Sequence, residues 1–170
     1  MMRTMETGRL RLRPLTDEDD AFILRLLNEP AYIEHIGDKA VRTLDDARTY
    51  VENGPRASYE AHGFGLDCVE LKASGEPIGM CGLLKRDILD DVDVGYAFLS
   101  EFWSRGYARE AVAAVLADAK TRLRLTRIAA VVSSANESSI RLLQKFGFRY
   151  EKMVSLYEGD TEVRLYVTDL

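Results

Sequence analysis

The 170-residue sequence has no apolar run that approaches the roughly 20 residues needed to span a bilayer. Its first residues, Met1–Glu6, also lack the apolar core of a signal peptide. Both absences argue against membrane insertion and export. We therefore expect no membrane partner and a cytoplasmic location.

Cysteine and histidine are scarce. The two cysteines, Cys68 and Cys81, match no metal-ligand or redox spacing, so reduced thiols of a cytosolic protein are expected. With only His35 and His62, a histidine-rich metal site is not favoured, and we predict no bound metal.

Positive charge is not in excess either. The net charge is -5, which argues against general nucleic-acid binding but leaves a local basic patch open. The chain is 46% hydrophobic and 30% charged, as in a soluble globular protein. Its length suits one domain with a proper core, so we predict a single domain over residues 1–170.

Hydrophobic periodicity predicts strands and helices along the whole chain. The patterns predict strands at 8–15, 64–71, 78–84, 92–99, 128–132, 149–156 and 161–167, and helices at 16–29, 43–52, 108–122 and 136–146. Three consecutive strands before a helix favour a mixed, largely antiparallel sheet. The crossover from 92–99 to 128–132 is right-handed, so these two strands are locally parallel. The predicted fold class is α/β (α+β), with about seven strands and about four helices in the order β-α-α-β-β-β-α-β-α-β-β.

Glycine and proline set the predicted boundaries in the first half of the chain. Pro30 stops the first helix, residues 31–42 form a loop, and Asn53-Gly54-Pro55 ends the second helix. Gly95, inside the strand at 92–99, suggests a bulge or a close approach by a backbone or ligand, with a plain flexible spot as the alternative.

The turn at residues 102–110, between a predicted strand and a predicted helix, is the first candidate for function. A helix N-terminus offers unpaired backbone N–H groups and the positive end of the helix dipole. Gly106 lets an anion approach the backbone, and Ala108 keeps the first helical turn open. Such a turn can cradle phosphate oxygens. An ordinary strand-to-helix connection with an incidental glycine explains this stretch alone equally well.

Two stretches together resemble the GNAT superfamily of acyl-CoA-dependent N-acyltransferases. Residues 94–111 resemble its pyrophosphate-binding motif, in which Gln or Arg, any two residues, Gly, any residue and Gly or Ala follow one another. Trp103 stands at the Gln/Arg position, as is usual in the branch similar to ribosomal-protein N-terminal serine and alanine acetyltransferases. Residues 136–148 resemble the Asn-x-x-Ser and Gly-Phe signature of that branch, and residues 9–15 also fit its opening.

This resemblance implies acetyl-CoA as the acyl donor. Backbone N–H groups of residues 105–108 would hold the pyrophosphate, and the acyl-pantetheine arm would lie between the strands at 92–99 and 128–132, paired like an extra strand. Asn136 would reach the arm, or serve only as a helix N-cap, or do both. The predicted cofactor-binding residues are Phe98, Leu99, Ser100, Arg105, Gly106, Tyr107, Ala108, Arg109 and Asn136. For the adenosine-side phosphate, nothing in the sequence chooses among Arg109, Arg141 and Lys145, and each also suits a solvated surface.

The reaction implied is direct acyl transfer from a thioester to a primary amine. Because amines have reference pKa values of about 8 to 10.4, a base must first remove a proton. Asp93 and Glu70 are the candidate bases, although strand carboxylates are more often surface groups. Ser139 occupies the position that the resemblance marks as proton donor to the leaving sulfur, with a backbone-bonding serine of the first helical turn as the alternative.

We therefore predict an N-acetyltransferase that acts on a protein or peptide N-terminal amine or on a small-molecule amine. The acceptor would contact the least readable segments, 31–42, 53–63 and 157–160. A non-catalytic acyl-CoA-binding or sensing domain is the alternative, since no unmistakable base stands out. The chain is expected to be a monomer or a homodimer.

Overall fold

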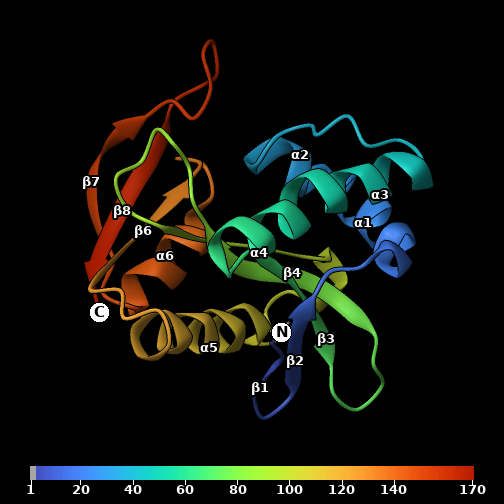
Figure 1. Ribbon diagram of the computed structural model, residues 1–170. Coiled ribbons are helices and arrows are strands. Elements are labelled where there is room, and N and C mark those ends of the chain that lie inside the picture. The colour runs from blue at the N-terminus through green and yellow to red at the C-terminus, as the bar shows by residue number, and fades with distance from the viewer. Residues whose placement is uncertain (1–2) are drawn as a thin grey trace.

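An eight-stranded mixed sheet runs through the molecule in the order β1-β2-β3-β4-β5-β6-β8-β7 (Figure 1). The structure is a computed structural model that describes residues 3–170. The strands are β1 (Met5–Glu6), β2 (Leu10–Pro14), β3 (Leu66–Leu71), β4 (Pro77–Leu84), β5 (Asp93–Phe98), β6 (Arg127–Val132), β7 (Arg149–Val154) and β8 (Val163–Asp169). The predicted parallel pairing of β5 and β6 is confirmed, and the other paired neighbours are antiparallel.

Helices cover both sides of this sheet (Figure 1). The four on one side are α1 (Asp20–Leu27), α2 (Pro30–His35), α3 (Leu44–Val51) and α4 (Ala57–His62), and the two on the other are α5 (Tyr107–Thr121) and α6 (Glu137–Lys145). The alanine-rich stripe of α5 is buried as its spacing predicts, at Ala111, Val112, Val115, Leu116 and Ala119. Within residues 3–170, no helix combines the length and apolar character required to cross a bilayer.

Capping interactions set several of the helix ends, and the predicted N-cap role of Asn136 is confirmed. Thr43 forms a capping box with Asp46 at the start of α3. The side-chain oxygen of Asn136 accepts a hydrogen bond from the Ser139 N–H, 3.3 Å away, at the start of α6. After α6, Gly147 adopts the left-handed conformation (φ +84°), and Phe148 packs back into the core.

Pro30 does not act as predicted. Helix α1 already ends at Leu27, and Pro30 is the first residue of α2, so residues 31–35 are helical and not loop. Proline suits this position because its fixed φ is helical and the first N–H of a helix has no intrahelical acceptor.

The predicted stop at Asn53-Gly54-Pro55 is also wrong. The chain leaves α3 through a π-helical turn, Glu52–Arg56, and continues into α4 until Gly63, which is left-handed (φ +75°). A proline in a helix removes an N–H and crowds the preceding turn, and the wider π turn accommodates it. Most of the segment 53–63 is therefore helical.

Gly95 carries no bulge against β4. It pairs with Gly82 in a register that continues without a break from Asp93 to Phe98. A Cβ built at Gly95 would lie 3.0 Å from the Leu84 side chain and 3.6 Å from the Leu66 side chain, so the atoms closest to this glycine belong to side chains and not to a backbone.

Strands β5 and β6 separate soon after they start, and this separation positions the site. Their register pairs Asp93 with Ala129. Further along, the Leu99 N–H donates to Ile78 at the start of β4. Because alternate residues of a strand direct their backbone groups to opposite sides, those of Tyr96 and Phe98 point away from β4, into the gap.

Candidate active site

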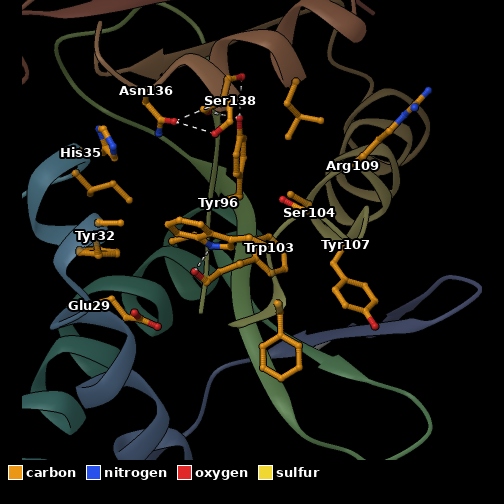
Figure 2. Close-up of a pocket in the computed structure, with 18 of the residues that line it drawn as sticks. Glu29, Tyr32, His35, Tyr96, Trp103, Ser104, Tyr107, Arg109, Asn136 and Ser138 are labelled. Atoms are coloured by element: carbon orange, nitrogen blue, oxygen red, sulfur yellow. Dashed lines mark hydrogen bonds between the residues drawn. The ribbon is translucent and has the colours of Figure 1, made fainter. Parts of the chain in front are cut away.

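A cavity of about 580 Å³ opens between α2, the end of β5 and the first turns of α5 and α6 (Figure 2). The sequence-predicted residues that line it are Phe98, Gly106, Tyr107, Ala108, Arg109, Asn136 and Ser139. The sequence-predicted residues outside its lining are Leu99, Ser100, Arg105, Asp93 and Glu70. The structure thus brings the two motif stretches together at one hollow.

The turn before α5 is shaped to expose N–H groups. Ser104 and Gly106 both have positive φ, +62° and +83°, on either side of Arg105, which does not. Such alternation turns successive N–H groups toward one side and creates an anion-binding concavity. No side chain caps the start of α5, so the N–H groups of its first turn are left for a ligand or solvent.

Three cationic side chains line the same cavity: Arg109 from α5, and Arg141 and Lys145 from α6. Within residues 3–170, Arg109 and Lys145 form no ion pair, and Arg141 lies 3.9 Å from the largely exposed Glu137 carboxylate. All three charges are therefore available to an anionic ligand. The Arg105 guanidinium instead lies over the Phe102 ring, 5.7 Å from its centroid.

The backbone at the end of β5 is already partly engaged. The Leu99 N–H donates to Ile78, and the Ser100 N–H donates to the Glu29 carboxylate at 3.1 Å, so of the three predicted backbone contacts only Phe98 faces the gap. The Phe98 carbonyl accepts a hydrogen bond from the Trp103 indole N–H at 2.8 Å. Figure 2 shows the half-exposed Trp103 ring lying across the cavity.

A pair of hydroxyl groups stands at the inner wall. Tyr96 Oη lies 2.5 Å from Ser139 Oγ. Burial raises the pKa of Tyr96 to about 12, while the contact with Ser139 acts in the opposite direction, so the phenol stays protonated near neutral pH. Tyr96 is not among the site residues predicted from the sequence. The available signal is its spacing of two from Phe98, which places both side chains on the same face of the sheet.

The two candidate carboxylates lie outside the cavity. Asp93 is fully buried, and its oxygens accept hydrogen bonds from Arg86 at 3.2 and 3.3 Å. Burial raises the pKa of Asp93 to about 6, although Arg86 opposes that rise. Glu70 accepts hydrogen bonds from Arg11 at 3.1 Å and Arg13 at 2.9 Å.

His35 lies in the segment 31–42 that is predicted to be a loop, but it is the last residue of α2 and it lines the cavity. In Figure 2 it stands on the wall that faces Asn136. Among the described residues, its Nδ1 is the one buried side-chain nitrogen or oxygen without a hydrogen-bond partner. A buried polar atom without a partner is costly, which makes His35 Nδ1 a candidate for a contact with a ligand or a water molecule. If Pro30 is interpreted as the start of a helix, His35 is predicted to lie in that helix and not in a loop.

Comparisons with known proteins find similarity over most of the chain. The family model described as an acetyltransferase (GNAT) domain matches residues 9–149. YkkB of Bacillus subtilis, an uncharacterized protein, is 32% identical over 154 residues, which cover 87% of this chain and 86% of YkkB. An acetyltransferase from Agrobacterium tumefaciens superposes with a TM-score of 0.84 at 24% identity and covers 99% of this chain and 95% of its own. RimL, a ribosomal L7/L12 α-N-protein acetyltransferase in complex with coenzyme A, superposes with a TM-score of 0.81 at 15% identity, with 99% and 98% covered.

Proposed function

The chain belongs to the GNAT family of acetyltransferases, and on that basis we propose that it transfers the acetyl group of acetyl-CoA directly to a primary amine. The observation that carries this proposal is the uncapped start of α5, which opens into a cavity that three cationic side chains also line. Coenzyme A has several phosphate charges followed by a long neutral arm. The cavity has matching groups in the same order. The exposed N–H donors at the start of α5 suit the phosphates, and the gap beside β5 suits the neutral arm.

The pyrophosphate would lie at the turn around Gly106, against the N–H groups of Tyr107 and Ala108. Arg109, Arg141 and Lys145 would hold the other phosphate charges. The pantetheine arm would follow the gap, where the backbone groups of Tyr96 and Phe98 replace the broader set of strand contacts expected from the sequence. RimL, whose fold this chain shares, is described with coenzyme A bound, and that similarity supports the placement.

In the reaction, the amine nitrogen attacks the thioester carbonyl, the carbon–sulfur bond breaks and an amide forms. The Tyr96 backbone N–H, which points into the gap, is the proposed donor to the oxyanion. The Tyr96–Ser139 hydroxyl pair would donate a hydrogen bond to the leaving sulfur. Since a thiol has a reference pKa of about 8.5 and the pKa of Tyr96 is about 12, the proton that finally rests on sulfur comes from the amine nitrogen.

For the base we propose His35 over Asp93 and Glu70. Imidazole is the side chain that changes charge between pH 5 and 8, and His35 borders the cavity. The Asp93 and Glu70 carboxylates are each held by arginine outside it. His35→Gln should lower kcat at least tenfold, on the order expected for a general base, and leave the Kd of acetyl-CoA unchanged. Glu29→Gln, on the same wall, is the matched control, and equal kcat losses in both variants would refute the assignment.

The proposed acceptor is a protein or peptide N-terminal amine, supported by the similarity to RimL, with a small-molecule amine as the other class. Acetyl-CoA should raise the melting temperature, because a ligand that binds only the native state stabilises it. A thiol-release assay with N-terminal peptides and small amines then identifies the acceptor class. Absence of any thermal shift at millimolar acetyl-CoA would refute the cofactor site. A shift without thiol release for any amine would favour a sensing domain.

A further inference from the structure

A salt-bridge cluster connects the beginning of the chain to the first turn of α5. Arg9, which directly precedes β2, donates from its Nε to Glu110 Oε1 at 2.8 Å and from its backbone N–H to Glu110 Oε2 at 2.9 Å. The Thr7 hydroxyl donates to the same Oε2. A segment about a hundred positions away therefore occupies both oxygens of one carboxylate in the helix that borders the cavity.

The same arginine also contacts the turn itself. Its Nη1 donates to the Arg105 carbonyl at 3.0 Å, and its guanidinium lies 4.4 Å from the centre of the Tyr107 ring. A Cβ built on Gly106 would lie 3.3 Å from Arg9 Nη2. Gly106 and Tyr107 line the cavity and Arg9 does not, so the guanidinium packs against the outer side of the turn.

This contact fixes the direction of a peptide group. The described residues include no cis peptide bond, and in a trans peptide the C=O and the following N–H point in opposite directions. Because Arg9 holds the Arg105 carbonyl on the outer side, the Gly106 N–H points to the other side, toward the cavity. Gly106 itself is left-handed (φ +83°), and this conformation directs the N–H groups at the start of α5 to the same side as its own N–H.

We propose that Arg9 is a positioning residue for the cofactor. Locked by Glu110, its guanidinium holds the Arg105–Gly106 peptide so that the N–H groups of the turn face the phosphate site before the cofactor arrives. This inference rests on the proposed function, because it assigns a role at the same cofactor site. Donors that are oriented in advance need no reorganisation on binding and therefore raise affinity.

The role requires arginine and not just a positive charge. A guanidinium is planar and presents five N–H donors in a fixed fork, so it can bind a carboxylate and a carbonyl at once while its face covers an aromatic ring. Lysine keeps the charge but has a compact ammonium on a flexible stem. Long-range attraction between Arg9 and the phosphates would survive the change to lysine, whereas the orientation of the peptide would not.

The test compares acetyl-CoA affinity, measured by calorimetry, in Arg9→Lys, Arg9→Ala and Glu110→Gln. We expect Arg9→Lys and Arg9→Ala to raise Kd by about tenfold each, Glu110→Gln to raise it less, and all three to keep kcat at saturating acetyl-CoA. Arg3→Ala is the matched control. Arg3 connects the same N-terminal segment to Asp118, in the last turn of α5, at 2.7 Å, with a similar 35% side-chain exposure against 47% for Arg9. It should lower the melting temperature without changing Kd.

Each other outcome has a definite meaning. Wild-type affinity in Arg9→Lys together with weak binding in Arg9→Ala would replace positioning by simple charge attraction and overturn the inference. Unchanged Kd in both variants, or an equal rise in Arg3→Ala, would reduce Arg9 to a contributor to stability. A wild-type protein that binds no acetyl-CoA would refute the proposed function itself, a result separable from all of these. If Arg9→Ala does not fold, Arg9→Lys and Glu110→Gln still decide.

Discussion

The helices α5 and α6 both begin at the cavity, and their first turns differ in one respect. At α6 the Asn136 side chain accepts the Ser139 N–H, so the chain caps its own helix. At α5 the N-cap is Gly106, which has no side chain, and the first turn is left open. A glycine at the N-cap costs only about a few tenths of a kcal/mol relative to a capping side chain. It leaves the first-turn N–H groups of α5 without a side-chain acceptor, and these groups are the proposed contacts of the cofactor phosphates.

Closing the open end should have the largest effect. Gly106→Glu places a carboxylate at the proposed phosphate site and strains a left-handed position, so we expect acetyl-CoA affinity to fall by about a hundredfold or more, measured by calorimetry. Gly106→Ala is the control, because it adds the strain without the charge and should lose far less affinity. Equal losses in the two variants would mean that backbone shape matters here and phosphate charge does not.

Changes to the hydroxyl pair formed by Ser139, at the capped end of α6, and Tyr96 of β5 should act on turnover and leave cofactor affinity intact. Tyr96→Phe and Ser139→Ala each remove one hydroxyl of the 2.5 Å pair, so kcat should fall about tenfold to a hundredfold in each. The double variant should lose less than the product of the two, because the residues share one hydrogen bond. Steady-state kinetics with parallel Kd measurements checks this. Unchanged kcat in Ser139→Ala would return that serine to a structural role.

The cap of α6 offers a smaller effect of a different kind. Asn136→Ala should lower the free energy of unfolding by about 1 kcal/mol and the melting temperature by about 2 to 4 °C. Asn136→Ser keeps a capping oxygen but shortens the side chain, so it should restore stability. If Asn136 also reaches the pantetheine arm, acetyl-CoA will bind more weakly to both variants. If Kd stays at the wild-type value, capping is its whole role.

The smallest effect is a pH dependence at the open end. Burial works against ionisation of Glu110, but hydrogen bonds from Thr7 and Arg9 outweigh it and lower the pKa of this carboxyl. A carboxyl with a lowered pKa adds stability above its ordinary value of 4.5, and this contribution is lost as the pH falls below that value. Glu110→Gln should therefore flatten the acid side of the melting curve against pH. A wild-type slope in the variant would contradict this assignment.

Local patterns predicted every strand except the two-residue β1, and they predicted α5 and α6, because each of these depends on residues only a few positions apart. The rule that proline ends a helix gave wrong predictions at Pro30 and Pro55. Pro30 is the first residue of α2, and Pro55 lies in a π-helical turn, and both positions accept a proline. The site residues likewise divide into those that a local pattern predicts and those that it does not. The turn at Gly106 and the position of Ser139 were readable from the sequence. The contact of Ser139 with Tyr96 and the grip of Arg9 on Glu110 were not, because folding alone brings such distant residues together.

Trp103 is the single tryptophan of the chain, and its indole N–H is bonded to the Phe98 carbonyl inside the cavity. Indole emission responds to the polarity and hydrogen bonding around the ring. The native protein therefore carries its own optical probe at the place where the acyl donor is proposed to enter. A titration followed by fluorescence can thus time the arrival and departure of the donor without any label attached.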